Sequence, residues 1–150
     1  MTDKKESRPS LLGLRHLALR VSDMESARAF YQELLGMTVV WEPDPENVYL
    51  SSGCDNLALH LMSEEDRTAF NPVGQTLDHF GFVVESPEAV EGYERRMREA
   101  GVRIVKPFKR HRDGSSSFYM ADPDGNVIQI LYEPHISPMK LGQGSTDPDQ

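Results

Sequence analysis

The chain has 150 residues, of which 38% are hydrophobic and 27% charged, which is typical of one water-soluble globular domain. The formal net charge of −8 argues against general binding to nucleic-acid phosphates, and no apolar run approaches the roughly 20 residues of a membrane-spanning helix. The single cysteine, Cys54, rules out an intrachain disulfide, and residues 1–10 lack the apolar stretch of a secretory signal. These features predict a cytoplasmic protein without nucleic-acid or membrane partners.

The two ends of the chain differ in composition from its body. Residues 1–10 are polar and charged, and residues 137–150 are rich in Gly, Ser, Asp, Pro and Gln, so both are expected to be disordered tails. Between them we expect a single domain over residues 11–136. It divides into module one over residues 12–63, a polar linker over 64–76 and module two over 77–136.

Module one is predicted to begin with a strand over residues 14–21. Ser22 or Asp23 is placed to cap a helix over Met24–Leu35, whose apolar residues recur at helical spacing, and Gly36 suits the position after its last turn. Three short strands are expected next: Thr38–Trp41, Val48–Ser52 and Leu57–Met62.

Module two repeats this order. A strand over Asp78–Val84 is followed by a helix with Ser86 as its cap and Pro87 at its first position. Three strands are expected next: Ile104–Phe108, Ser116–Ala121 and Val127–Tyr132. A βαβββ unit that occurs twice indicates a duplicated supersecondary element. Each copy would form a curved antiparallel or mixed sheet with its helix on the convex side.

Two histidines occupy the same place in the two modules. His16 and His79 each open the first strand pattern of their module. If the modules pack around a pseudo-two-fold axis, both imidazoles would point into one shared cavity. Since imidazole is a common ligand of divalent metals, the repeat predicts a metal or ligand site there.

Several segments resemble the vicinal oxygen chelate superfamily, over about residues 12–135. That superfamily includes glyoxalase I, extradiol ring-cleaving dioxygenases, fosfomycin-resistance proteins and bleomycin-binding proteins. The resemblance implies an α+β fold in which two βαβββ modules pair into a cup-shaped, half-open barrel with helices on the outside. The segments are His-Leu-Ala-Leu-Arg-Val-Ser-Asp at 16–23, Phe-Tyr at 30–31, His-Phe-Gly-Phe-Val-Val at 79–84, Phe-Tyr at 118–119 and Asp-Pro-Asp-Gly-Asn at 122–126.

The resemblance also implies one divalent metal ion (Fe, Mn, Ni or Zn) held by the first and last strands of the modules. The residues at those places are His16, His60, His79 and Gln129. The family usually has glutamate where this chain has Gln129. A glutamine keeps a carbonyl oxygen that can bind a metal weakly or line the pocket, but it brings no charge and cannot act as a base.

Two candidate residues have alternative interpretations. Counted from Asn56 and Asn126, His60 is one residue out of register with Gln129, and a one-residue slip would turn its ring to the other face of the sheet. Tyr119 would donate a proton or a hydrogen bond to substrate, or else be a core tyrosine with a bonded hydroxyl. A basic loop is expected nearby, either as a solvated hairpin tip or as a cover for an anionic ligand; it comprises Lys106, Lys109, Arg110, His111 and Arg112.

Two functions of different class follow. The first is a divalent-metal-dependent, glyoxalase- or dioxygenase-like enzyme whose small-molecule substrate binds through adjacent oxygens, with Tyr119 and Gln129 as catalytic residues. The second is a metal-free protein of the bleomycin-resistance type that binds or sequesters a small molecule, which the missing carboxylate favours. The resemblance further implies a homodimer, with the site either within one chain or across two.

Overall fold

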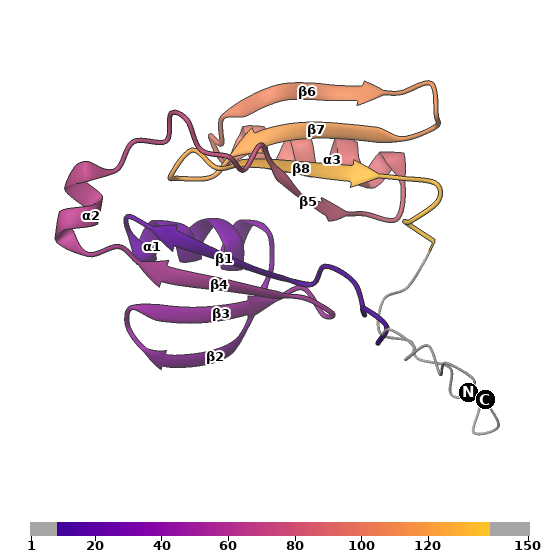
Figure 1. The fold of residues 1–150 in the computed structure, drawn as a ribbon. Helices are drawn as coiled ribbons and strands as arrows, with labels where there is room; N and C mark the ends of the chain where they lie inside the picture. The colour runs from indigo at the N-terminus through magenta and orange to yellow at the C-terminus, as the bar shows by residue number, and fades with distance from the viewer. Residues whose placement is uncertain (1–8, 139–150) are drawn as a thin grey trace, which may run out of the picture.

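Each half of the chain folds into a four-stranded mixed sheet with a helix against one face (Figure 1). The computed structural model describes residues 9–138, so the expected tails, residues 1–10 and 137–150, lie almost wholly outside the described residues. The α+β class and the repeated βαβββ order are confirmed.

The two sheets have the same topology. Sheet A has the strand order β1–β4–β3–β2, and sheet B has the order β5–β8–β7–β6. In each sheet the first strand runs parallel to the last, and the other neighbours are antiparallel. The strands are β1 (His16–Val21), β2 (Thr38–Asp44), β3 (Asn47–Ser51), β4 (Asn56–Leu61), β5 (Phe80–Val83), β6 (Ile104–Arg110), β7 (Ser116–Ala121) and β8 (Val127–Tyr132).

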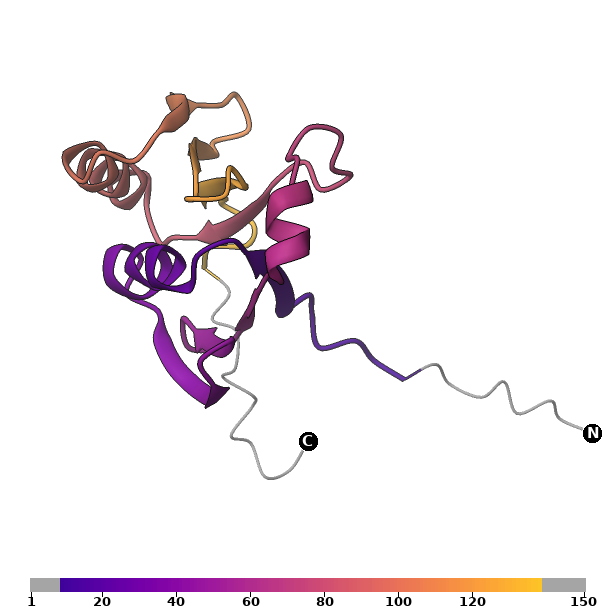
Figure 2. The ribbon, with the colours of Figure 1, turned by 90° about the vertical axis from the view of Figure 1, so that its left-hand side faces the viewer.

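One face of each sheet packs against helices, and the other face is open. Figure 2 shows α1 (Met24–Arg28) and α3 (Pro87–Glu99) on the same side of the two sheets. Side chains alternate across a strand, so every second residue points to this helix side and forms the core. The largest fully buried side chains there are Tyr31, Phe118, Leu50, Leu59, Met97, Met120, Ile128 and Ile130.

The first helix changes its pitch halfway. Asp23 caps α1 by accepting a hydrogen bond from the Glu25 amide at 3.0 Å, as expected. The chain then continues as a π-helix over Ala29–Leu34, so the single α-helix expected over Met24–Leu35 is wrong in its second half. The wider π turn leaves both Phe30 and Tyr31 buried although they are adjacent in sequence.

Four other expectations need correction. The linker contains a short helix, α2 (Glu64–Ala69), that was not expected. Ser63 caps it, accepting from the Asp66 amide at 3.0 Å, and a serine followed three residues later by an acid was the available signal.

None of the helices in the described part of the chain is long and apolar enough to cross a bilayer.

The other three corrections concern strand ends. β5 begins at Phe80, so His79 immediately precedes the strand instead of lying inside it. β6 continues to Arg110, so Lys106, Lys109 and Arg110 lie on a strand and not in a loop. β2 likewise continues through Pro43. Both β2 and β6 are edge strands, where proline is tolerated because one side of the strand makes no ladder bonds.

The two modules are joined by polar contacts between their helices and one turn. The hydroxyl of Tyr31 donates to Asp122 Oδ2 at 2.6 Å, and the Ser22 amide donates to Asp124 at 3.1 Å. Arg96 of α3 donates to the carbonyl of Leu34 at 3.1 Å. Because these bonds connect residues 62 to 102 positions apart, they fix how the sheets sit relative to one another.

The buried Tyr31 hydroxyl predicts a loss of stability at high pH. Burial first, and then the carboxylates of Asp122 and Asp124, raise the pKa of Tyr31 well above its usual value. Above about pH 10 the unfolded chain loses this proton while the folded chain keeps it, so the free energy of unfolding falls as the pH rises. Urea unfolding should be measured at intervals of roughly one pH unit between pH 8 and 11. The free energy of unfolding should decline more steeply for the natural chain than for Tyr31→Phe. Parallel declines would contradict the prediction.

Candidate functional site

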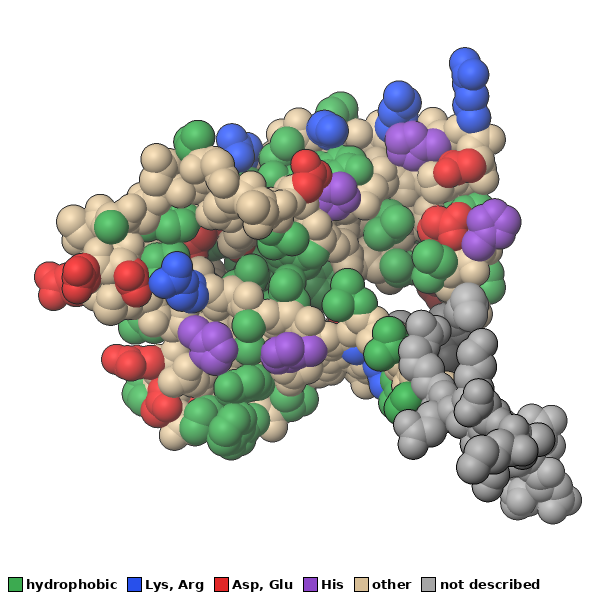
Figure 3. Space-filling view, in the orientation of Figure 1, with side chains coloured by type: hydrophobic (Ala, Val, Ile, Leu, Met, Phe, Trp, Pro, Cys, Tyr) green, Lys and Arg blue, Asp and Glu red, His purple; other side chains and the backbone are tan. Residues whose placement is uncertain are grey.

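Sheet A presents His16 and His60 on its open face. β1 pairs with β4 so that His16 lies opposite Asn56 and Arg20 lies opposite His60. The residues between them, such as Leu19, point to the core. Figure 3 looks onto the open faces and shows histidine side chains over both sheets. Both histidines of sheet A are therefore accessible to a ligand from the same side.

Sheet B brings three of the predicted residues together. Gln129 lies opposite Gly81 on β5 and opposite Tyr119 on β7. The Gln129 Nε2 amide donates to the Tyr119 hydroxyl at 2.9 Å, and the ring of His79 meets the Tyr119 ring edge-on with centroids 5.1 Å apart. His79, Tyr119 and Gln129 thus form one cluster, which we call the sheet B cluster.

Two neighbours shape the sheet B cluster. The ammonium group of Lys106 lies 5.0 Å from the centroid of the Tyr119 ring, within cation–π distance. Gly81 allows the close approach of β5 to β8, because a Cβ atom there would lie 2.9 Å from the Gln129 carbonyl oxygen. The cluster therefore combines two hydrogen-bonding side chains, an imidazole and a nearby positive charge.

His16 and His79 line one cavity between the modules. The cavity has a volume of about 320 Å³ and is bounded by the starts of β1, β4 and β5. Tyr119 and Gln129 lie beside His79 but outside the lining of this cavity. The two equivalent histidines thus reach a common space. The cavity is also lined by Leu14, Arg15, Leu17, Met37, Asp55, Asn56, Leu57, Leu77, Phe80 and Phe82.

His60 lies apart from this cavity. Two residues after His16 the ladder pairs Ala18 with Ala58, so Ala58 is the counterpart of Gln129, and His60 is two residues further on. The expected one-residue offset is wrong, because Asn56 already belongs to β4 whereas Asn126 precedes β8. His60 keeps the face of His16 but lies about 13 Å further along the strand direction, at roughly 3.3 Å per residue.

In each of the three predicted histidines, the Nδ1 nitrogen is hydrogen-bonded to an oxygen of a neighbouring side chain. His16 Nδ1 bonds to Asn56 Oδ1 at 2.7 Å, and His79 Nδ1 bonds to the carboxylate of Asp78. An acceptor at Nδ1 places the proton there and leaves the Nε2 lone pair for a cation. Oriented imidazoles of this kind are typical of metal ligands, whose other nitrogen is held by a carboxylate or carbonyl.

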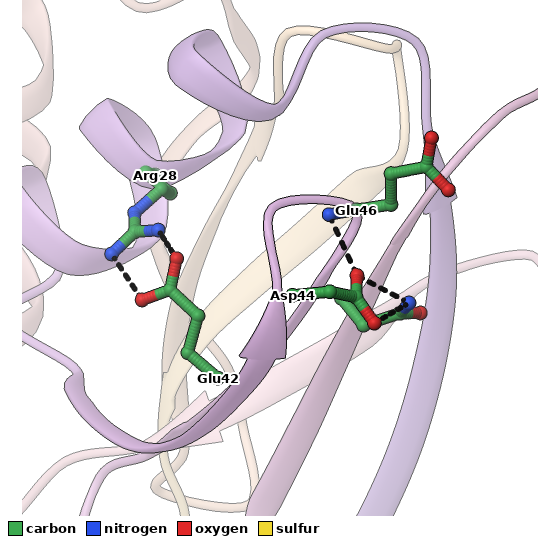
Figure 4. Close-up of polar contacts among 5 residues, drawn as sticks. Arg28, Glu42, Asp44 and Glu46 are labelled. Carbon is green, nitrogen blue, oxygen red and sulfur yellow. Dashed lines mark hydrogen bonds and ion pairs between the residues drawn. The ribbon is translucent and has the colours of Figure 1, made fainter.

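His60 is held in the same way by a longer chain of contacts. Its Nδ1 bonds to Asn47 Oδ1 at 2.6 Å, and Asn47 Nδ2 donates to Asp44 at 2.8 Å. Figure 4 shows Asp44 also accepting from the Glu46 amide, at 2.9 Å. In the same view Arg28 of α1 holds Glu42 of β2 through two hydrogen bonds of 2.6 and 3.1 Å. The β2–β3 hairpin is thereby fixed beneath His60.

The donor types suit a divalent first-row metal. Two neutral imidazoles, His16 and His79, would offer Nε2, and Gln129 would offer Oε1 because its Nε2 is used on Tyr119. Within residues 9–138, no group of three or more His, Cys, Asp or Glu side chains is arranged to hold a metal. A site here would therefore include the neutral amide and lack an anionic ligand.

Sequence reasoning missed the side chains that orient the imidazoles. Asp78 is adjacent to His79, and an acid beside a histidine was a usable signal. Asn56 lies 40 residues from His16, so only the strand pairing brings the two together. The position of Lys106 over Tyr119 likewise depends on the pairing of β6 with β7.

Comparison with known proteins places this geometry in context. A family model described as the glyoxalase/bleomycin resistance protein/dioxygenase superfamily matches residues 13–130. Glutathione transferase FosA from Serratia marcescens is 34% identical over 122 residues, which cover 80% of this chain and 80% of that protein. Metallothiol transferase FosB from Bacillus licheniformis is 25% identical over 120 residues, or 80% of this chain and 75% of that one.

A solved structure agrees in fold. The crystal structure of a glyoxalase-related enzyme from Fulvimarina pelagi superposes with a TM-score of 0.66 at 24% identity, covering 83% of this chain and 90% of that chain. At this identity the similarity concerns the arrangement of the strands and helices alone.

Proposed function

Because the chain belongs to the glyoxalase/bleomycin resistance protein/dioxygenase superfamily, we propose that it is an enzyme that binds a divalent metal ion and acts on a small molecule bearing adjacent oxygens. The observation that carries the proposal is the shared cavity of His16 and His79, each with Nδ1 held by a neighbouring oxygen. His16 and His79 are the proposed ligands from the cavity wall, and Gln129, which lies beside Tyr119 and outside the lining of the cavity, is proposed as the third ligand. A bound metal ion would supply Lewis acidity toward the substrate oxygens.

The sheet B cluster would bind and orient the substrate. The Tyr119 hydroxyl accepts a hydrogen bond from Gln129, so its own proton is available for a substrate oxygen. Lys106, beside the Tyr119 ring, adds a positive charge that favours an anionic substrate group. His60, on the same side of sheet A and held by Asn47, would face the substrate and not the metal.

The neutral Gln129 favours one reaction type among those of the superfamily. A glyoxalase-like isomerisation needs a base at this place, and a dioxygenase-like ring opening uses an anionic ligand there; an amide supplies neither. A thiol needs no such carboxylate, because its ordinary pKa of about 8.5 already provides thiolate near neutral pH. Since two relatives are named as a glutathione transferase and a metallothiol transferase, we propose that a small thiol is added to the substrate. The thiolate sulfur would form a bond to a substrate carbon, the carbon–oxygen bond at that carbon would break, and the released oxygen would take up the proton that the thiol lost.

A metal-free binding protein is the second candidate. The observation that favours it is the absence of a carboxylate among the proposed ligands, which lowers the affinity for any divalent cation. It makes the opposite prediction for added metal. Chelator-treated protein would then keep the same thermal midpoint in the presence of Mn²⁺, Zn²⁺, Ni²⁺ or Fe²⁺, because only a ligand of the native state stabilises it.

Replacing Gln129 with glutamate tests the metal assignment directly. The natural chain is expected to show a higher thermal midpoint with at least one of the four cations, and Gln129→Glu should bind that cation about tenfold or more tightly, since a carboxylate adds a charge beside the ion. Calorimetric titration of chelator-treated protein measures both. Tyr119→Phe is the matched control, because it alters the same hydrogen bond without adding charge. Equal cation affinity in the natural chain and Gln129→Glu would exclude Gln129 as a ligand.

We also propose a homodimer. The open face of sheet A exposes 58% of Trp41, whose ring lies 4.9 Å from that of Tyr49. Aromatic residues are enriched at protein–protein interfaces relative to the rest of the surface, which favours this face as the dimer contact. Light scattering of the purified chain would give twice the monomer mass, and a monomer at all concentrations would contradict the proposal.

A further inference from the structure

A second cavity lies between the modules, next to α2. It has a volume of about 490 Å³ and contains no residue of the proposed metal site. Figure 1 shows α2 where the linker passes from β4 to β5, and Figure 3 shows the surface recessed between the two modules. We call this space the linker cavity. Its lining residues are Ala18, Leu19, Arg20, Met62, Asp66, Ala69, Phe70, Asn71, Gln75, Leu77 and Asn126.

The linker cavity presents both signs of charge at one point. The Nη1 atom of Arg20, on β1, lies 3.3 Å from the Oδ2 atom of Asp66, on α2. Both side chains are more than half exposed, so the ion pair contributes little to stability and opens at little cost. Asn71, Gln75 and Asn126 complete the polar part of the lining. The cavity thus offers charge-bearing and neutral hydrogen-bonding groups together.

We propose that the linker cavity binds the head group of an α-amino acid, with Arg20 holding the carboxylate and Asp66 holding the ammonium group. In an amino acid the two charged groups are attached to one carbon atom, so their partners must lie close together, as Arg20 and Asp66 do. Such a ligand replaces one exposed ion pair by two charge-assisted contacts. A simple anion would meet repulsion from Asp66, and a simple cation would meet repulsion from Arg20.

The position of the linker cavity links it to the proposed reaction. A smaller cavity of about 190 Å³ shares Gln75, Leu77 and Asn126 with it and extends to Asp78 and His79. An amino acid held at Arg20 could therefore direct its side chain toward the sheet B cluster. The part of the inference that identifies the ligand as the thiol donor rests on the proposed function. The recognition of the zwitterionic head group does not depend on it.

Binding of capped thiols to the purified full-length chain tests the proposal. S-methylcysteine carries both charges, 3-(methylthio)propionate lacks the ammonium group, and 2-(methylthio)ethylamine lacks the carboxylate; the methyl group prevents a thiolate from binding metal. By calorimetry, S-methylcysteine should bind about tenfold or more tightly than either fragment. Arg20→Gln and Asp66→Asn should each weaken its binding by a similar factor, about tenfold. Glu65→Gln, one residue along α2, is the control and should bind it unchanged.

The fragments separate the two roles. Arg20→Gln should weaken the propionate alone, and Asp66→Asn should weaken the amine alone. Absence of S-methylcysteine binding, equal affinity for the propionate, or unchanged binding in both variants would overturn the proposal. Metal titration of the same samples keeps the two hypotheses apart. Metal binding without amino-acid binding would defeat only this inference, and amino-acid binding through Arg20 and Asp66 without metal would defeat only the proposed metal-dependent function.

Discussion

Replacement of His79 by alanine is expected to remove a divalent cation from the purified protein, and replacement of His16 should do the same. Each imidazole lines the shared cavity with its Nδ1 already bonded, so each would contribute one Nε2 ligand. Loss of a group that merely orients a ligand costs roughly 10–100-fold in metal affinity, so loss of the ligand itself should exceed about 100-fold. Elemental analysis of protein purified without chelator or affinity tag measures the stoichiometry, and competition with a chelator measures the affinity.

Two further variants sharpen this experiment. Asp78→Asn keeps an oxygen near His79 but removes the charge that orients the ring, so its effect should fall in the range of about 10–100-fold. His135→Ala removes an imidazole that lines none of the cavities described above and should leave metal content unchanged. Unchanged metal content in both His16→Ala and His79→Ala would remove the basis for the metal-dependent function.

The second large effect is expected at Asp122, which is buried between the modules with 6% of its surface exposed. Its Oδ1 accepts from the amides of Asp124 and Asn126 at 3.0 and 2.8 Å, and its Oδ2 accepts from Asn126 Nδ2 at 2.8 Å and from the Tyr31 hydroxyl at 2.6 Å. Asp122→Ala leaves these donors without a partner. Since one buried unpaired group costs about 1–3 kcal/mol, we expect the free energy of unfolding to fall by about 3–5 kcal/mol.

Urea unfolding followed by far-UV circular dichroism measures this loss. Glu65→Ala, on the exposed α2, is the control and should change the free energy of unfolding by less than about 0.5 kcal/mol. If Asp122→Ala unfolded at the same urea concentration as the natural chain, the hydrogen bond between Tyr31 of the π-helix and Asp122 would not hold the modules together.

Local patterns predicted most of the fold because their causes are local. Ser116–Ala121 and Val127–Tyr132 were predicted with the observed bounds, since turn residues separate two short segments that are rich in aromatic and β-branched residues. The helix over Pro87–Glu99 was marked by its serine cap and its first-turn proline. The π-helix at Ala29–Leu34 was not predicted, because its apolar spacing resembles that of an ordinary helix and its pitch follows from the packing of Phe30 and Tyr31.

The candidate site was predictable to a smaller extent. The repeat pointed to His16 and His79, and the cavity that both line was found. The position of His60 was not predictable, because strand pairing makes Ala58 the counterpart of Gln129 and leaves His60 two residues further along β4. Turn lengths of this kind decide register, and register is settled by which backbone groups finally pair.

The sequence by itself determined the duplicated βαβββ order, the two equivalent histidines and the loss of a carboxylate at Gln129, because each of these is a property of residue type and spacing. Only the tertiary structure decided which oxygen orients each imidazole, that Gln129 bonds to Tyr119, and that Arg20 meets Asp66 across a cavity. Apart from Asp78 beside His79, these partners lie 10 to 46 residues apart. Their contacts depend on how the strands pair and the linker folds back, which no local pattern specifies.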